Sequence, residues 1–244
     1  MKLVIISPFQ FSYRRGIERF VYSLSNHLIK LNDWEIIIYA WGEQNDIYWG
    51  DWNSNIKIRR IPYFRYFRKY LASIFYNIWL LIDKPQKILI NFIYQGEEFL
   101  PSKSELYYVL NSPASQIPNR YKIISKNIKK FKKINFIAVS QLVRNEGIPF
   151  INKQIDIINN GVDTEYFKYR ENNNSNTKVL KLVTPAALEE RKGFKYIIKA
   201  LSIMKDKSIH YDIFGDGNYK SEIKKMIKKY KLEDQVKLHP STDN

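Results

Sequence analysis

A run of charged residues beside a glycine is the segment of this sequence best suited to bind an anion. The stretch Pro-Ala-Ala-Leu-Glu-Glu-Arg-Lys-Gly begins at Pro185 and ends at Gly193, with Arg191 and Lys192 together just before a predicted helix. A lysine in this place could neutralise a diphosphate leaving group, because a cation stabilises the charge that develops there. Taken alone, the segment fits an ordinary charged, solvated helix start even better.

Two glycine-containing turns could bring a phosphate close to the backbone. Gly16 lies within Arg-Arg-Gly-Ile-Glu-Arg, residues 14–19, where a helix is expected to begin, and Gly215 and Gly217 flank Asp216 after a predicted strand. A glycine at such a point lets a ligand approach the free N–H groups of a helix N-terminus. Either turn alone would also suit a simple connection between two elements.

A fourth segment, Ile-Asn-Asn-Gly-Val-Asp over residues 158–163, contains the turn formers Asn160 and Gly161 and is followed by Phe167. An Asn-Gly pair is common in turns, and by itself it indicates little more.

The sequence offers little to bind a metal. His27, His210 and His239 stand apart from one another, and no carboxylates are spaced as a metal site would require. We therefore expect no metal and no other cofactor, and we interpret each histidine as structural.

The elements expected to position these segments alternate between strands and helices. Such alternation predicts right-handed βαβ crossovers and a parallel sheet. Ser140 is expected to cap a short helix that runs through Arg144. In the first part of the chain the predicted strands are 2–7, 35–40, 56–61, 87–94, 106–110, 136–139 and 155–158, and the longer predicted helices are 17–31, 66–82 and 120–133.

A polar stretch over residues 171–177 interrupts this alternation and is typical of a linker. Beyond it we predict strands at 179–184, 209–214 and 235–238 and helices at 194–204 and 219–230. The sequence therefore predicts an α/β protein with two Rossmann-like domains: 1–160, a linker over 161–178, and 179–244. The cleft between the two domains is the expected site, because ligands bind at the carboxyl ends of parallel strands.

The second predicted domain has three strands, whereas an open sheet usually has about five or six. We therefore expect this domain to be incomplete: either the chain is truncated at its C-terminus or the missing part of the domain comes from elsewhere.

The order of these motifs resembles that of family 4 glycosyltransferases, and the resemblance covers essentially the whole chain. The shared features are a glycine loop with an adjacent glutamate after the first strand, a helix that begins with serine, Asn-Gly-Val-Asp with a later phenylalanine, a Lys-Gly helix start and a Gly-Asp-Gly turn. These relatives are retaining enzymes with the GT-B architecture. Each motif alone is weak, but the ordered set is specific, most of all between Phe136 and Gly217.

The resemblance implies roles for particular residues. Gly16 would line the donor diphosphate and Lys192 would contact it, while Gly215 and Gly217 would shape the nucleotide pocket. Asn160, Gly161 and Asp163 would form the junction between the domains. The reaction implied is transfer of a sugar from a nucleotide-diphosphate donor to a glycan or lipid-linked acceptor, with retention and without a metal, in cell-surface polysaccharide synthesis.

The sequence departs from the family pattern at three places. Ala187 stands where many members have an arginine, and Arg191 is the candidate to replace it. Asn111 stands where many members have a histidine that contacts the sugar. The glutamate segment that normally contacts the donor sugar and ribose would lie beyond Asn244, so the catalytic residues remain unknown.

Composition narrows the remaining classes of protein. Hydrophobic residues make up 45% of the chain, which is typical of a globular protein, and the absence of cysteine excludes disulfides and thiolate sites. The N-terminus lacks a signal-peptide pattern, and the longest apolar stretch, 71–82, is shorter than the roughly 20 residues that span a bilayer. We therefore predict a cytoplasmic protein.

The formal net charge of +16 favours anionic partners, although a bias of the whole sequence toward lysine contributes to it. Two segments are candidates for contact with an anionic membrane at its inner face: 65–70 with the apolar run after it, and the lysine-rich 126–133. In the alternative interpretation the first segment packs in the core and the second is a solvated helix face.

Three other interpretations of the sequence remain open. The chain could be a catalytically inactive remnant that only binds, or another two-domain nucleotide-sugar enzyme such as an epimerase. A nucleic-acid-binding protein is disfavoured, because the basic residues are spread along the chain and no recognised nucleic-acid-binding motif is present.

Overall fold

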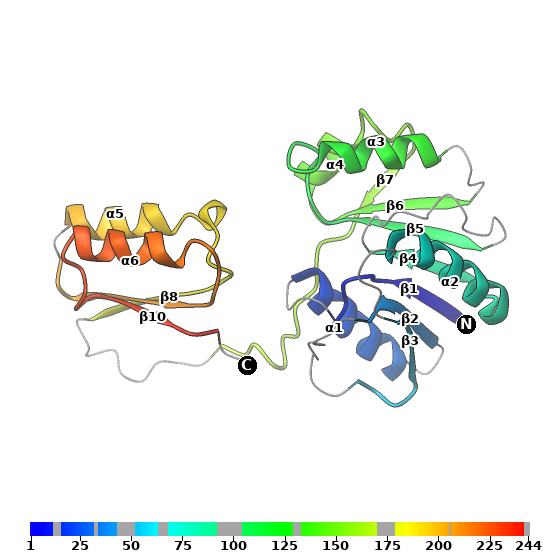
Figure 1. The fold of residues 1–244 in the computed structure, drawn as a ribbon, viewed down its shortest axis with the longest axis horizontal. Helices are drawn as coiled ribbons and strands as arrows, with labels where there is room; N and C mark the ends of the chain where they lie inside the picture. Colours follow the sequence, from blue (N-terminus) through cyan, green and yellow to red (C-terminus); the bar gives the residue numbers. More distant parts are fainter. Residues whose placement is uncertain are drawn as a thin grey trace. The chain divides into compact units, whose positions relative to one another are not determined.

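The structure is a computed structural model of the 244-residue chain. It describes residues 1–11, 16–31, 34–42, 52–62, 68–91, 104–128, 133–169, 179–204 and 206–241. The chain divides into two compact units, which we call the N-terminal unit (Met1–Asp163) and the C-terminal unit (Thr164–Asn244) (Figure 1).

The N-terminal unit is built on a seven-stranded sheet in the order β3-β2-β1-β4-β5-β6-β7. Every neighbouring pair in this sheet is parallel. Central strands such as Ile36–Ala40 are buried throughout, because a parallel sheet is covered on both faces. The strands are β1 (Lys2–Ile6), β2 (Glu35–Trp41), β3 (Ile56–Ile61), β4 (Lys87–Ile90), β5 (Glu105–Leu110), β6 (Ile134–Ala138) and β7 (Ile155–Ile157).

Two apolar cores lie on opposite faces of this sheet. On one face, Val21 and Ile29 of α1 (Gly16–Lys30) pack on Leu3, Ile5 and Ile36. On the other face a larger core joins the sheet to three helices, α2, α3 and α4 (Figure 1). These helices are α2 (Arg68–Asp83), α3 (Pro118–Asn127) and α4 (Gln141–Gly147).

The C-terminal unit contains a three-stranded parallel sheet in the order β10-β9-β8. One face of the sheet packs against two helices that lie side by side, and alternate residues of β9 (Ile209, Tyr211 and Ile213) enter this core (Figure 1). The elements are β8 (Leu180–Pro185), α5 (Phe194–Met204), β9 (Ile209–Phe214), α6 (Lys220–Lys229) and β10 (Val236–His239).

Most predicted elements are present within one or two residues of the expected bounds. Ser140 caps α4 as predicted, since its hydroxyl oxygen accepts a hydrogen bond from the backbone nitrogen of Val143. Two predictions were wrong in extent: the strand predicted over 87–94 ends at Ile90, and the helix predicted over 120–133 ends at Asn127. Of the linker predicted over 161–178, residues 170–178, which include the polar stretch 171–177, lie outside the described residues.

Candidate functional site

In the N-terminal unit, polar side chains gather at the carboxyl ends of β1, β4 and β5. Asn91 follows β4 directly and is 1% exposed. Its amide nitrogen donates to the backbone oxygen of Ile17 at 3.2 Å, which ties the end of β4 to the first turn of α1. Asn111, which follows β5, donates to the Asn91 backbone oxygen at 2.9 Å and to its side-chain oxygen at 3.1 Å. The predicted site residue Asn111 is therefore part of a network that holds the start of α1.

The loop after β1 joins the same network from its other side. Gln10 is fully buried, and its amide nitrogen donates to the backbone oxygen of Glu18 at 2.9 Å. The Ser7 hydroxyl donates to the side-chain oxygen of Gln10 at 3.0 Å. The start of α1 is thus held by side chains from two strand ends, which fixes the direction of its free N–H groups.

Gly16, the first residue of α1, has open space around it. Apart from its chain neighbours and the backbone of its own helix, no atom of the described residues lies within 4 Å of the place where a Cβ would be. Nothing in the described part of the chain therefore blocks a larger side chain at this position. Arg14 and Arg15 of the same motif lie outside the described residues.

A small cavity of about 30 Å³ adjoins the asparagine network. Asn91, Asn111, Ser112, Arg120 and Tyr121 are among its lining residues. The Tyr121 hydroxyl donates to the Ser112 backbone oxygen at 2.8 Å, and burial, with a smaller effect of the Glu146 charge, raises the pKa of Tyr121 to about 12. Burial also lowers the pKa of Arg120 from its usual value. The cavity has room for about one water molecule and is lined by hydrogen-bond donors and acceptors.

Sequence analysis missed Asn91, Gln10 and Arg120 as members of this site. Asn91 carries no local signal, because the apolar residues Phe92, Ile93 and Tyr94 follow it in the sequence. The strand was therefore predicted to continue through Asn91 to residue 94.

In the C-terminal unit, the structure brings the Lys-Gly and Gly-Asp-Gly motifs together at the carboxyl ends of β8 and β9. The backbone nitrogen of Leu188 donates to the Asp216 backbone oxygen at 3.0 Å, and that of Tyr219 donates to the Leu188 backbone oxygen at 2.9 Å. The loop that leads to Lys192 therefore lies directly on the Gly215–Gly217 turn.

Gly215 and Gly217 make this close approach feasible. Gly215 has φ of 150° and Gly217 has φ of 159°, values that side chains rarely tolerate. A Cβ on Gly215 would collide with the Ala186 backbone oxygen, and one on Gly217 would collide with the Leu188 backbone. The glycines of this motif are thus required by packing within the chain, whatever they contact in addition.

The two cations of the Lys-Gly motif differ in their surroundings. Arg191 is paired with Glu189 at 2.5 Å, and its side chain is 68% exposed. Lys192 is also exposed, and within the parts of the chain that the structure describes its ammonium group has no ion pair or hydrogen bond. Both precede Gly193, which has φ of 77° and ends a short 3-10 helix at Glu190–Lys192. Lys192 can therefore bind an anion without first breaking an ion pair, whereas Arg191 would have to leave Glu189.

An aromatic pair lies at the same strand ends. Phe214 and His239 end β9 and β10, and their rings stack 4.4 Å apart at 15°. The His239 ring nitrogen Nε2 lies 2.5 Å from an Asp212 carboxylate oxygen, and the Gly215 backbone nitrogen donates to the His239 backbone oxygen at 3.3 Å.

The predicted junction residues Asn160, Gly161 and Asp163 are all exposed. Asn160 and Gly161 follow the last strand of the N-terminal unit, and Asp163 is the last residue of that unit. Among the described residues, no group of three or more His, Cys, Asp or Glu side chains could hold a metal ion.

Comparisons with known proteins identify the class of this chain. Residues 165–244 match the family model described as glycosyl transferases group 1. The match covers the Lys-Gly and Gly-Asp-Gly motifs and confirms the prediction that the chain is a glycosyltransferase. No curated protein sequence matches the chain.

Solved structures match the chain over both units. HepE of Anabaena, in complex with UDP and glucose, matches with a TM-score of 0.74 and 15% identity, over 100% of this chain and 70% of that one. A glycosyltransferase from Rickettsia africae matches with a TM-score of 0.69 and 15% identity, over 99% of this chain and 68% of that one. A mutant of S. aureus TarM in a complex that includes UDP matches with a TM-score of 0.68 and 11% identity, over 99% of this chain and 78% of that one. At these identities the similarity establishes the fold, and the predicted GT-B class of α/β fold is confirmed.

Proposed function

We propose that this glycosyltransferase belongs to family 4 and binds a nucleotide-diphosphate sugar through Lys192 and the turn Gly215–Gly217. Gly16 is proposed as a further residue that contacts the donor diphosphate. The observation that carries the proposal is the contact between the Lys192 loop and the Gly-Asp-Gly turn in the region of the family match. The UDP found in the HepE and TarM structures supports a nucleotide donor.

The proposed reaction joins an acceptor hydroxyl oxygen to the anomeric carbon of the donor sugar while the bond from that carbon to the diphosphate oxygen breaks. The acceptor proton leaves with the diphosphate or passes to water. Lys192 would stabilise the negative charge of the departing nucleoside diphosphate, which requires no covalent intermediate with the protein and no metal. We propose that the configuration at the anomeric carbon is retained.

The proposed acceptor is a glycan or lipid-linked sugar used in cell-surface polysaccharide synthesis. A lipid-linked acceptor would place the protein in the cytoplasm, peripherally at the inner face of the membrane. The described residues contain no helix that is long and apolar enough to cross a bilayer.

Calorimetric titration with UDP, GDP and ADP tests the donor site and identifies the base. We expect saturable binding of one nucleotide and at least about tenfold weaker binding by Lys192→Ala, since a charge-assisted contact contributes about 1.5–3 kcal/mol. Lys207→Ala is the matched control, because Lys207 is exposed before the amino end of β9, away from the proposed site.

Two outcomes would contradict the proposal. The donor site is wrong if the folded chain binds none of the three nucleotides, or if both lysine variants bind as the unchanged chain does. Binding of a nucleotide sugar without transfer to any glycan or lipid-linked acceptor would instead favour the interpretation that the chain only binds.

A further inference from the structure

A continuous row of large aliphatic side chains faces outward on α2. Ile74, Ile78, Leu81 and Ile82 are 55%, 48%, 69% and 61% exposed. Their spacing of four, three and one residues places them on one face of the helix, opposite the buried face. Single exposed aliphatic residues are common, but a contiguous row of four marks a surface that binds something apolar.

The opposite face of α2 is fixed in the core, so the helix cannot turn to bury this row. Ala72, Tyr76 and Leu80 are at most 2% exposed. The Tyr76 ring stacks on that of Tyr39 in β2, with 5.6 Å between ring centres. Rotation of α2 therefore cannot remove the row from the outer face of the helix.

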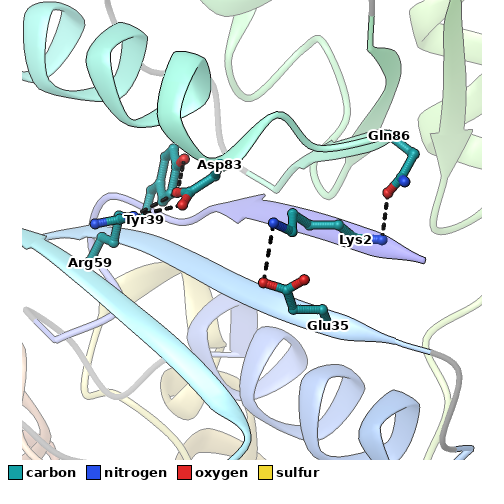
Figure 2. Close-up of polar contacts among 6 residues, drawn as sticks. All are labelled: Lys2, Glu35, Tyr39, Arg59, Asp83 and Gln86. Carbon is teal, nitrogen blue, oxygen red and sulfur yellow. Dashed lines mark hydrogen bonds and ion pairs between the residues drawn. The ribbon is translucent and has the colours of Figure 1, made fainter.

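The last residue of α2, Asp83, connects the end of the helix to the sheet through hydrogen bonds (Figure 2). Its carboxylate accepts hydrogen bonds from Arg59 of β3 at 2.7 and 2.6 Å and from the Tyr39 hydroxyl at 2.6 Å. The Asp83 side chain is 4% exposed. Both its burial and its partners keep this negative charge away from the outward row.

Charge along the helix indicates the kind of surface that the row would meet. Asp83 is the single acidic residue in the sequence of α2, while the helix begins with Arg68 and Lys69. The exposed Lys84 follows directly after its end. The aliphatic row thus lies between basic residues in the sequence, and the only acidic residue in the sequence of α2 is buried, a pattern that complements an anionic and apolar surface.

We propose that α2 docks the protein on an anionic lipid bilayer, with Ile74, Ile78, Leu81 and Ile82 entering the boundary between headgroups and acyl chains. A helix of 16 residues is about 24 Å long, so it would lie along the surface rather than span it. The purpose that we assign to this docking, which is to bring the enzyme to a lipid-linked acceptor, rests on the proposed function. Residues 129–132 of the lysine-rich segment 126–133 lie outside the described residues, and the proposal does not include this segment.

Sedimentation with vesicles tests the docking. We compare phosphatidylcholine vesicles with and without phosphatidylglycerol, using the unchanged chain and the double variant Ile78→Glu with Leu81→Glu. The chain should bind the anionic vesicles and lose binding as salt is raised. The double variant should bind at least about tenfold more weakly, because two apolar side chains no longer enter the lipid.

Leu142→Glu is the matched control, since Leu142 is 59% exposed on α4 of the same unit and should tolerate the change without loss of vesicle binding. Circular dichroism and the thermal midpoint establish that the double variant is folded. Its nucleotide binding should be unchanged, so failure of the donor-site proposal and failure of the docking proposal are told apart.

The docking proposal is overturned if the unchanged chain does not bind anionic vesicles, or if the double variant binds them as well as the unchanged chain does. A dimer in solution that the double variant abolishes would assign the row to a second copy of the chain, and this result would also overturn the lipid proposal.

Discussion

The two units hold their strand ends in different ways. In the N-terminal unit, side chains form the ties: Asn91 and Asn111 join β4, β5 and α1, and Asp83 joins α2 to Arg59. In the C-terminal unit, backbone groups of the Leu188 loop and the Gly-Asp-Gly turn bond directly to each other. The first arrangement depends on particular polar side chains, whereas the second depends on the absence of side chains at Gly215 and Gly217.

Because of this difference, glycine is present for different reasons in the two units. A Cβ at Gly217 would collide with backbone, whereas a Cβ at Gly16 would meet open space. Glycine at 217 is explained by the fold alone. The described residues do not explain glycine at 16, and we propose contact with a bound ligand as its reason.

The largest effect should follow from Gly217→Ala. We expect a loss of about 3 kcal/mol in the free energy of unfolding of the C-terminal unit, because the collision with the Leu188 backbone strains both loops. Denaturant unfolding with hydrogen exchange at α5 and α6 would measure it. Gly161→Ala is the control, because no described atom lies within 4 Å of its added methyl group, and it should leave the free energy of unfolding nearly unchanged. Equal stability of the two variants would contradict the collision at Gly217 as the cause of the loss.

A smaller effect of about 2 kcal/mol is expected for Asp83→Asn in the N-terminal unit, since removing one partner of a buried ion pair leaves the other uncompensated. Burial alone would raise the pKa of Asp83, but hydrogen bonds from Arg59 and Tyr39, with the charges of Arg59 and Lys57, hold that pKa below its usual value.

A depressed carboxyl pKa stabilises the fold above the unfolded-state pKa of about 4, and this stability is lost as the pH falls through the lower folded-state pKa. Unfolding curves from neutral pH down to about pH 2 should therefore show less acid sensitivity in Asp83→Asn than in the unchanged chain. Asp156→Asn, at an exposed carboxylate, is the control, and an unaltered pH profile in Asp83→Asn would refute the role of the pair.

Asn91→Ala should cost about 1–2 kcal/mol, because the Ile17 backbone oxygen and the Asn111 amide lose a buried partner. Hydrogen exchange at residues 17–21 should become faster. Asn159→Ala removes a similar bond to the Val139 backbone oxygen at an exposed position, and it should leave α1 unchanged. If α1 exchanges at the same rate in both variants, Asn91 does not hold the helix start.

Gly16→Ala should produce the smallest change in stability, below about 0.5 kcal/mol, since the space around it is open and alanine suits a helix. Nucleotide binding should nevertheless weaken by about threefold or more if the diphosphate approaches this backbone. Calorimetry beside Gly161→Ala measures the difference, and equal affinities would remove Gly16 from the donor site.

Much of the fold could be predicted from local pattern. The helix at 194–204 and the strands at 56–61 and 209–214 have the predicted bounds, because polar residues or turn formers flank their apolar periodicity. The strand at 87–90 was predicted too long, because Phe92, Ile93 and Tyr94 continue the apolar run past Asn91. A buried polar residue inside an apolar run gives no local signal that the strand has ended.

The site was less predictable, because its contacts join residues far apart in the sequence. Nothing near Gly217 reveals that Leu188 packs against it, and nothing near Arg191 distinguishes its pairing with Glu189 from the open position of Lys192. The same limit applies to α2, where apolar residues on both faces hide which face is buried.

The most direct test of the donor site is a titration of the isotope-labelled protein with UDP, followed by backbone amide NMR shifts. Our account predicts saturable shifts at Lys192, Gly193, Gly215 and Gly217, with little change at Lys207 and Ser208 before the amino end of β9. Saturable shifts that leave the Lys192 loop and the Gly-Asp-Gly turn unchanged would contradict it.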